Sequence, residues 1–524
     1  MASSKHIDII CLAAALLSLL ITVLFMNGEA LGLTAVPSGG TEDGQFTADD
    51  CNPDWDRNGA TRISLNGSSA EISGNGAYPY DGGVYIASAG KYVISGELTD
   101  GSIVVDANRN DMIWILLDGV SLFRSDNAAF LVEQAGKVFL TLADGTDNFI
   151  ASGAVYTEGA VSAGVDGAVY SRDDLTVNGN GSLSVSADYR HAVVCNDDLV
   201  ITGGTVSLTA AQDGIHANDS VRMTGADVTI QAGDDGITVS NDEETGYVYI
   251  ASGSIDIPAC YEGVEAISVT IAGGTISIRP DDDGINANGQ GDNSVIQITG
   301  GDITIINESG RDADGLDSNG DIHISGGRVF ISVNGDGGSC ALDCGSENGG
   351  VCDISGGTVV AAGGSAMAEG FDAGSEQCFL MFNSESVPAG SEVVLSDADG
   401  NVLLSAAIPC PFSSVVISLP ELEMGENCVI SIGGAEESVT IDNSSASDGF
   451  RPGGMPGRPQ GMPENGPRGG KSMDGGRPDG GPGGQMGPPP GEGDSVSYDF
   501  LPVLILSVVL LCAGLAFALL FKQK

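Results

Sequence analysis

Residues 273–287 read Gly-Gly-Thr-Ile-Ser-Ile-Arg-Pro-Asp-Asp-Asp-Gly-Ile-Asn-Ala and contain the pattern that decides the fold. After the double-glycine turn, apolar residues alternate with polar ones, and this period of two is typical of a β-strand with one buried face. An acidic residue, a glycine and an apolar residue then begin a second short segment. Because both halves recur along the chain, we interpret the segment as one unit of a repeat.

The repeat is spaced like the coils of a solenoid. The residues that precede the strands of the first half stand at positions 181, 204, 226, 253, 274, 301, 327 and 357, which are 21 to 30 residues apart. The acidic-glycine motif recurs between them, beginning at Asp213, Asp235, Glu262, Asp283 and Asp314. Three short strands in a repeat of about 25 residues predict an all-β fold, a right-handed parallel β-helix solenoid. Helical repeats are excluded, because they need an apolar spacing of 3.6 residues.

Asparagines follow most of the acidic-glycine motifs at a constant distance. Asn218, Asn288 and Asn319 each stand five residues after the first position of a motif, and Asn196 stands five residues after His191. In stacked coils these amides would lie above one another, which predicts a structural ladder of amide hydrogen bonds.

The two ends of the chain resemble targeting and membrane segments. Residues 9–25 form an apolar run after Lys5, and small residues precede a cleavage point after Ala30, so we expect a secretory signal or an N-terminal anchor. Residues 500–521 carry no charge and precede a lysine-containing tail, which predicts one C-terminal transmembrane helix with a cytoplasmic C-terminus. The protein would then be a single-pass protein on the extracellular face of the cell membrane.

A segment rich in Gly, Pro and Met separates the folded part from the predicted membrane helix. It has too few apolar side chains to fold and no strict glycine period, so we interpret it as a tether. The resulting parts are residues 1–30, signal peptide or N-terminal anchor; 31–82, N-terminal extension and cap; 83–375, parallel β-helix; 376–443, small C-terminal β module; 444–498, linker; and 499–524, transmembrane helix and cytoplasmic tail.

The charge of the chain restricts its partners. Its 71 acidic and 20 basic residues give a formal net charge of −51. Nucleic acid is excluded as a partner, because phosphate neutralisation requires a basic face. Carboxylates gather at one turn of each coil, where stacked like charges repel unless divalent cations or protons intervene. We therefore expect divalent cations at this acidic edge, the alternative being a solvated edge without specific sites.

Several runs of residues resemble a known family. They are residues 174–183, the acidic-glycine and double-glycine series, and the segments 396–402 and 413–418. Together they resemble the extracellular carbohydrate-binding parallel β-helix family, over roughly residues 83–434. The resemblance implies a pectate-lyase-like fold, bound calcium, and binding of polysaccharide without cleavage. The chain departs from the family pattern at His191, which stands where the family usually has an acidic residue.

Calcium is the cation that these observations favour, because it prefers several hard oxygen ligands. The EF-hand loop and the Gly-Gly-x-Gly-x-Asp calcium repeat are both absent from the sequence, so the ligands are assigned from their place in the repeat. The candidate calcium ligands are Asp213, Asp234, Asp235, Asp281, Asp282, Asp283, Asp312, Asp314 and Asp317.

Aromatic and basic side chains of the coils are the candidates for carbohydrate binding. Tyrosine rings offer platforms for neutral sugars, whereas an acidic, pectin-like polymer would need bridging cations to approach an anionic protein. The candidates are Tyr189, Tyr247, Tyr261, Arg279 and Arg311, whereas Trp114 is assigned to the core. We therefore predict a monomeric, calcium-assisted binder of plant-cell-wall-type polysaccharide, either pectin-like or cellulose.

Two alternatives stay open. A calcium-dependent polysaccharide lyase would need a base to remove a sugar proton, and the arginines of the coils, Arg190, Arg279, Arg311 and Arg328, are the candidates. An arginine beside aspartates is more commonly a salt-bridge partner, and hydrolysis by paired aspartates lacks its accompanying motifs. No catalytic residue is therefore assigned. The second alternative is a structural spacer or adhesin at the cell surface.

Overall fold

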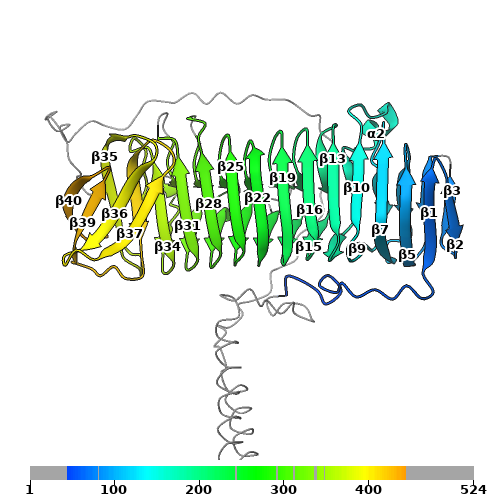
Figure 1. Cartoon of the computed structure of the whole chain (residues 1–524), viewed down its shortest axis with the longest axis horizontal. Coiled ribbons are helices and arrows are strands. Elements are labelled where there is room, and N and C mark those ends of the chain that lie inside the picture. The colour runs from blue at the N-terminus through cyan, green and yellow to red at the C-terminus, as the bar shows by residue number, and fades with distance from the viewer. Residues whose placement is uncertain are drawn as a thin grey trace, which may run out of the picture. The chain divides into compact units, whose positions relative to one another are not determined.

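The structure is a computed structural model that describes residues 44–443, except 81, 242–244, 291–292, 311–312, 336–338 and 347–348. Nearly all regular structure in this range is β-strand, and α2 (Glu158–Ser162) is the one α-helix among the described residues. The strands lie side by side along a stack of coils (Figure 1). Each coil contributes one strand to each of three faces, in the order face 1, face 2, face 3.

The strands of each face are parallel, and from β8 to β31 each pairs with the strand three places further along the chain. Face 1 consists of β9 (Lys137–Leu142), β12 (Leu175–Gly179), β15 (Asp198–Ile201), β18 (Ser220–Met223), β21 (Tyr247–Ile250), β24 (Ser268–Ile271), β27 (Val295–Ile298), β30 (Asp321–Ile324) and β33 (Cys352–Ile354). Face 2 consists of β10 (Asp147–Ser152), β13 (Ser182–Ala187), β16 (Thr205–Ala210), β19 (Ala226–Ala232), β22 (Gly253–Cys260), β25 (Thr275–Pro280), β28 (Asp302–Asn307), β31 (Arg328–Val333) and β34 (Thr358–Gly363). Face 3 consists of β4 (Gly83–Ile86), β6 (Ser102–Asp106), β8 (Phe130–Gln134), β11 (Gly167–Ser171), β14 (His191–Cys195), β17 (Ile215–Ala217), β20 (Ile237–Val239), β23 (Val264–Ala266), β26 (Ile285–Ala287), β29 (Leu316–Ser318) and β32 (Leu342–Cys344).

The first coils are wider than the later ones. Three long strands, β1 (Thr61–Gly67), β5 (Gly90–Leu98) and β7 (Met112–Arg124), pair in parallel with one another. The first part of β7 pairs with β9 on face 1 and its last part with β10 on face 2, so that one strand joins the two faces.

Glycine is required at two turns of the coil. Gly274, in the turn from face 1 to face 2, has φ +95°, which residues with a Cβ rarely adopt. Gly214, in the acidic-glycine motif, is required for space: a Cβ would lie 2.1 Å from Cγ2 of Ile230 and 2.8 Å from the carbonyl oxygen of Gly236 in the next coil. The two glycine motifs of the sequence therefore mark the turns at which the chain bends and the coils approach most closely.

The core consists of columns of apolar side chains that run through the stack. On face 3 the register places one inward-facing residue of every coil in a single column. Its members are Val84, Ile103, Phe130, Val169, Val193, Ile215, Ile237, Val264, Ile285, Leu316 and Leu342. All of them are buried, and each contributes roughly 1.5–3 kcal/mol of transfer free energy. This stacking explains why the inward positions of the repeat are occupied by Ile, Val and Leu.

Antiparallel strands cover both ends of the solenoid. At the start, β2 (Ala70–Ser73) pairs with β1, and β3 (Ala77–Tyr80) pairs with β4. At the other end, β34 pairs with β38 (Phe412–Ser418), which also pairs with β35 (Phe379–Val387). A separate four-stranded sheet contains β36 (Ser391–Asp397), β37 (Val402–Ile408), β39 (Asn427–Ile432) and β40 (Ala435–Thr440). This coverage pairs the first strands of the solenoid and the last strand of face 2, whose edges would otherwise be open to other chains.

Residues 44–58, which precede β1, lie against the outer surface of face 1 and belong to the blue segment of Figure 1. Asp50 is 1% exposed and forms an ion pair of 2.8 Å with Nζ of Lys137 at the start of β9. Arg222 of β18 donates a hydrogen bond of 2.7 Å to the carbonyl oxygen of Gln45. We call residues 44–58 the N-terminal strap.

The predicted all-β class and the stacked parallel strands of the repeat are confirmed, whereas the right-handed sense of the coil stays a prediction. The described residues contain no helix that is long and apolar enough to cross a membrane. The predicted signal or anchor (1–30), linker (444–498) and transmembrane helix (499–524) lie outside the described residues. The proposed domain boundaries also stay predictions.

The predicted ladder of amide side chains is not what the structure contains at two of its positions. Asn196 donates a hydrogen bond of 2.9 Å to the hydroxyl of Tyr170, and Asn288 donates one of 2.6 Å to Oε1 of Glu265. These amides therefore bind different partners in neighbouring coils instead of one another. The side chains that link the coils regularly are carboxylates.

Candidate functional site

The acidic-glycine motifs place one residue of each coil in a row at the start of face 3. Backbone hydrogen bonds between coils, such as the one from Gly284 N–H to the carbonyl of Asp314 at 2.9 Å, fix this register. We call the row the acid row, and its members are His191, Asp213, Asp235, Glu262, Asp283, Asp314 and Cys340. Three residues further on, an outward-facing row contains His216, Thr238, Glu265, Asn286, Asp317 and Asp343. Carboxylates of successive coils thus stack on one edge.

Carboxylates of the acid row accept backbone hydrogen bonds from the next coil. Oδ1 of Asp283 accepts the N–H of Asp314 at 2.7 Å, and Oδ1 of Asp314 accepts the N–H of Cys340 at 2.6 Å. Asp235 accepts the N–H of Glu262 at 3.1 Å in the same way. The acid row therefore satisfies main-chain donors at the bend between coils, in addition to any role in binding ions.

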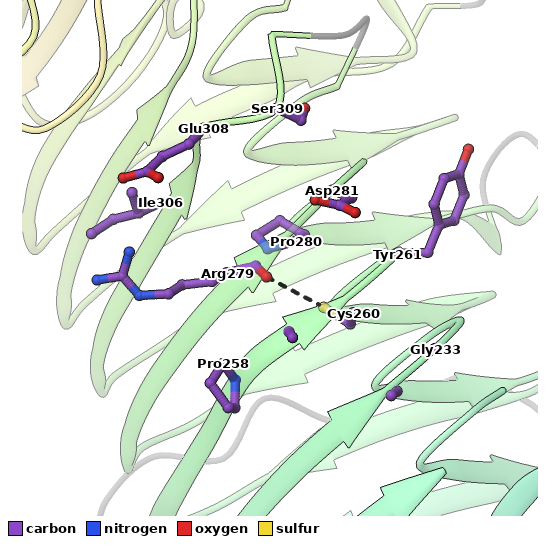
Figure 2. A pocket seen from close by; sticks show the side chains of 12 residues that line it. Gly233, Pro258, Cys260, Tyr261, Arg279, Pro280, Asp281, Ile306, Glu308 and Ser309 are labelled. Atoms are coloured by element: carbon purple, nitrogen blue, oxygen red, sulfur yellow. Dashed lines mark hydrogen bonds between the residues drawn. The ribbon is translucent and has the colours of Figure 1, made fainter. Parts of the chain in front are cut away.

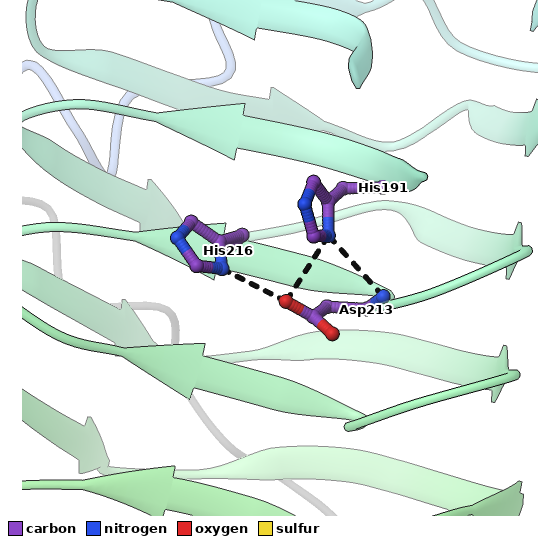
Figure 3. Close-up of side chains that lie close together, drawn as sticks. All are labelled: His191, Asp213 and His216. Atoms are coloured by element: carbon purple, nitrogen blue, oxygen red, sulfur yellow. Dashed lines mark hydrogen bonds and ion pairs between the residues drawn. The ribbon is translucent and has the colours of Figure 1, made fainter. Parts of the chain in front are cut away.

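Two histidines share the carboxylate of Asp213 (Figure 3). Oδ2 of Asp213 lies 3.0 Å from Nδ1 of His191 and 2.8 Å from Nδ1 of His216, and both His191 and Asp213 are buried. Burial opposes ionisation of Asp213, but the hydrogen bonds from the two histidines lower its pKa overall. Burial also opposes a charge on His216, yet its bond to Asp213 raises its pKa. The departure from the family pattern at His191 thus gives Asp213, at this end of the acid row, a second imidazole partner.

Further along the stack, the carboxylates are held close to one another. Burial is the largest cause of the raised pKa values there, and repulsion between neighbouring carboxylates adds to it. The pKa rises to about 7 for Asp235 and Asp314 and to about 8 for Glu262 and Asp317. Near neutral pH this part of the row must therefore keep protons or gain nearby positive charge.

Three clusters of described residues bring their possible ligand atoms within 4.8 Å of one another. They are His191 with Asp213 and His216; Asp213 with Asp234 and Asp235; and Asp314 with Cys340 and Asp343. The all-carboxylate cluster of Asp213, Asp234 and Asp235 offers the hard oxygen donors that fit calcium. The imidazole and thiol donors in the other two suit softer ions better.

The nine candidate calcium ligands lie in several different places. Asp213, Asp235, Asp283 and Asp314 lie in the acid row, Asp317 lies in the outward-facing row, and Asp234 lies beside Asp235. Asp281 and Asp282 precede Asp283, and Asp281 points into a groove described below. Asp312 lies outside the described residues.

A groove on face 2 begins where β22 is irregular. The pairing of β22 with β19 shifts after Thr229, and its pairing with β25 shifts after Ile257, so that Pro258 and Ala259 interrupt the regular ladder. Such bulges bend a strand and redirect its side chains. The resulting hollow has a volume of about 590 Å³ and is lined by residues at the ends of β19, β22, β25 and β28 and in the segments that follow them.

Three residues that the sequence singled out meet in this groove (Figure 2). Tyr261 is 41% exposed and lies at one end, whereas Arg279 extends at the other. Arg279 has no ion pair within the part of the chain that the structure describes, unlike Arg328, which lies 2.9 Å from Asp302. Asp281 lies between Tyr261 and Arg279. The groove therefore presents an aromatic ring, a guanidinium group and a carboxylate to solvent.

The other candidate carbohydrate-binding residues lie elsewhere. Tyr189 packs against Tyr156, with ring centroids 4.4 Å apart. Tyr247 donates its hydroxyl to the side chain of Gln45 at 3.2 Å and so lies next to the N-terminal strap. Arg311 lies outside the described residues. Of the five candidates, the structure thus brings Tyr261 and Arg279 together.

Sequence reasoning missed several polar residues of these sites. Glu262 begins an acidic-glycine motif, so the repeat itself could have added it to the candidate ligands. Glu308 lines the groove close to Arg279, but the segment after β28 carries no pattern that indicates this position. Glu265 and Asp343 occupy the outward-facing row, which requires the register of face 3 to be known.

The structure is thus a solenoid of stacked parallel strands that presents an aromatic and basic groove beside an acidic edge. The profile of the carbohydrate-binding domain-containing protein family matches residues 80–365, which is more than half of the chain. The chain belongs to this family, and the family expected from the sequence is confirmed.

Two individual proteins extend this comparison. A carbohydrate-binding domain-containing protein from Acetivibrio thermocellus is 41% identical over 192 residues, which cover 36% of this chain and 67% of that protein. A solved structure, described as the polysaccharide lyase-like protein from C. thermocellum in a gadolinium derivative, is 26% identical. Its alignment covers 57% of this chain and 99% of that chain, with a TM-score of 0.41.

Proposed function

We propose that this protein binds polysaccharide in the groove of face 2, assisted by calcium at the acid row, and does not cleave it. One observation carries the proposal: Tyr261 and Arg279 line the same open groove. Tyr261 is exposed, and Arg279 has no ion pair among the described residues. Tyrosine rings stack on the apolar faces of sugars, and guanidinium groups bind hydroxyl and carboxylate oxygens.

A plant-cell-wall-type polymer, either pectin-like or cellulose, fits this groove. Tyr261 provides a stacking surface for a neutral glucan, and Arg279 provides a counter-charge for a uronate. The chain as a whole carries a formal charge of −51, so a polyanion approaches it at a cost that bridging cations reduce. We therefore expect the binding of an acidic polymer to depend on calcium more strongly than the binding of cellulose.

Calcium at the acid row is supported by the donor set and by burial. Asp213, Asp234 and Asp235 bring carboxylate oxygens together, and burial raises the pKa of Asp235 to about 7. A bound calcium ion would supply the positive charge that lets such carboxylates ionise inside the fold. The residues themselves hold the oxygens in place through the hydrogen bonds between coils.

The main alternative is a calcium-dependent polysaccharide lyase, and one observation favours it. Arg279, one of the candidate bases, lies in the groove near Asp281 and has no ion pair among the described residues. The binding function is preferred because no histidine, lysine or tyrosine other than Tyr261 lines the groove in the described part of the chain. A structural spacer or adhesin would leave the exposed groove residues unexplained.

The proposed cellular location of the protein rests on two segments in the C-terminal part of its sequence. The apolar segment 500–521 and the Gly/Pro/Met-rich segment 444–498 would anchor the folded part to the cell membrane and hold it on the extracellular face, where calcium and cell-wall polymers are available.

One experiment tests the function. The purified protein is incubated with polygalacturonate and with cellulose, in calcium or in chelator, and both retention on the polymer and the absorbance of unsaturated products are followed. The proposal expects retention without product formation, and weaker retention on polygalacturonate in chelator. Product formation would establish the lyase, and no retention on either polymer would favour the spacer.

A further inference from the structure

The N-terminal strap and the first coils enclose a second pocket, on a different face from the groove. Its volume is about 190 Å³, and it lies between the strap and the strands β5, β7, β9 and β12. The groove, in contrast, is formed on face 2 by the ends of β19, β22, β25 and β28 and the segments that follow them. The two hollows therefore share no residue, and the strap pocket needs its own explanation.

Both tryptophans of the chain line the strap pocket. Trp114 is an outward-facing, half-buried residue of β7, and its ring stacks on Phe139 of β9 at a centroid distance of 5.8 Å and an interplanar angle of 5°. Trp55 belongs to the strap, and Nζ of Lys91 lies 5.4 Å from its ring centroid. The assignment of Trp114 to the core is thus wrong, because alternation along β7 turns its side chain outward.

Polar side chains complete the wall of the pocket. Asn178 is 2% exposed and donates its amide N–H to the carbonyl oxygen of Asp50 at 3.1 Å. Its Oδ1 atom has no hydrogen-bond partner within the described residues. A buried amide oxygen without a donor costs stability, and Asn178 is one of the residues that line the pocket. Thr141 of β9 adds a further hydroxyl to the wall.

The size and charge of the pocket select the ligand. Its volume is about 190 Å³, whereas pockets for drug-sized ligands measure roughly 300–1,000 Å³. This favours a single ring over an oligosaccharide. Asp49 and Asp54 outnumber Lys91 among its charged residues, which disfavours a uronate carboxylate. Aromatic rings combined with amide and hydroxyl groups are suited to a ring with apolar faces and polar edges.

We propose that the strap pocket binds one neutral sugar ring of a glycan, at a site separate from the groove. The ring stacks on Trp114 or Trp55, and its hydroxyl groups bind Asn178 and Thr141. Such a site would hold a glycan at a second point along the solenoid and strengthen attachment through the effective concentration of the tethered chain.

Tryptophan fluorescence of the full-length protein tests this proposal directly. Since both tryptophans line the pocket, their emission reports on no other part of the chain. Titration with cellobiose should change the emission in a saturable manner. Digalacturonate should need at least a tenfold higher concentration to produce the same change. In Asn178→Ala and in Trp55→Ala, the titration midpoint should rise about tenfold, with Trp114 still reporting in both.

The control separates the strap pocket from the groove. Tyr261→Ala should keep the fluorescence response of the wild type, even where it reduces retention on polysaccharide. Thr141→Val provides a second, conservative variant if Trp55→Ala does not fold, and it should also raise the midpoint. An emission that no sugar changes, a midpoint unaffected in Asn178→Ala and Thr141→Val, or a response to digalacturonate as strong as to cellobiose would each overturn the proposal.

Discussion

Oδ1 of Asp283 accepts the backbone N–H of Asp314 at 2.7 Å, so that a side chain of one coil binds the main chain of the next. The same arrangement recurs at Asp314 and at Asp235. Each of these carboxylates of the acid row therefore has two roles. Its oxygen accepts a backbone N–H at the bend between coils, and its negative charge must be balanced at a partly buried edge.

Removal of one carboxylate from the acid row should weaken the stack. Asp283→Ala leaves the N–H of Asp314 without its acceptor and should lower the free energy of unfolding by about 1–3 kcal/mol. Asp283→Asn keeps an amide oxygen at that position and should lose less. Urea denaturation measures the difference, with the exposed Asp256→Ala on face 2 as the matched control. Equal stability of Asp283→Ala and the control would show that the hydrogen bond contributes nothing.

The stability of the metal-free protein should fall as the pH rises from about 4 to 8. Burial raises the pKa of Asp235 from 3.8 to about 7 and that of Glu262 from 4.5 to about 8. Between the unfolded and folded pKa values, the folded state binds more protons than the unfolded state, so a higher pH favours unfolding. Thermal unfolding in chelator across this range should give falling midpoints.

Calcium should remove most of this pH dependence, because it binds the ionised carboxylates of the folded state and stabilises that state by mass action. Thermal unfolding at pH 8 should therefore show a midpoint several degrees higher in millimolar calcium than in chelator, and little difference at pH 4.5. A midpoint that rises with pH in chelator, or that calcium leaves unchanged at pH 8, is incompatible with this description of the acid row.

Substitutions in the groove should weaken polysaccharide binding. Tyr261→Ala removes the stacking ring, and Arg279→Ala removes the guanidinium group. Each should lower affinity about tenfold, which corresponds to about 1.4 kcal/mol. Depletion of protein from solution by insoluble polymer measures the effect. Tyr78→Ala, which removes another exposed tyrosine at the start of the solenoid, and Arg328→Ala, which removes a paired arginine of face 2, should bind like the wild type.

The attachment of the N-terminal strap to face 1 should depend on one buried ion pair. Asp50→Ala leaves the charge of Lys137 without its partner, and such changes cost about 3–5 kcal/mol. We expect faster proteolysis of residues 44–58 in this variant, measured by mass spectrometry of the released peptides. The double substitution Asp50→Leu with Lys137→Met should be less harmful than Asp50→Ala, because it leaves no unpaired charge. The exposed Asp56→Ala serves as the control, and proteolysis as slow as in the control would contradict the assigned role of Asp50.

The repeat of the fold could be predicted because its turns restrict the residue type. Gly274 needs a positive φ and Gly214 needs the space of a missing side chain, so both positions appear in the sequence as motifs with a regular spacing. The inward columns of Ile, Val and Leu also appear in the sequence, because the repeat places these apolar residues at a regular spacing. The stacking of carboxylates followed from this spacing alone.

The groove and the strap pocket could not be predicted, since neither arises from the repeat. The groove depends on the irregular pairing of β22 around Pro258, where the coil departs from its neighbours. The strap pocket depends on contacts between segments far apart in the chain, such as Asp50 with Lys137. Trp114 lies in an apolar run that resembles core sequence, and only the register of β7 shows that it faces outward.

Calorimetric titration of the wild type and of the double variant Tyr261→Ala/Arg279→Ala with an oligogalacturonate and a cello-oligosaccharide tests the central claim most directly. In calcium, the wild type should bind at least one of the two saturably, without release of unsaturated product. The double variant should bind it about 100-fold more weakly, which corresponds to about 2.7 kcal/mol. Equal binding by both proteins would contradict the assignment of the groove, and no binding by the wild type would contradict the proposed function.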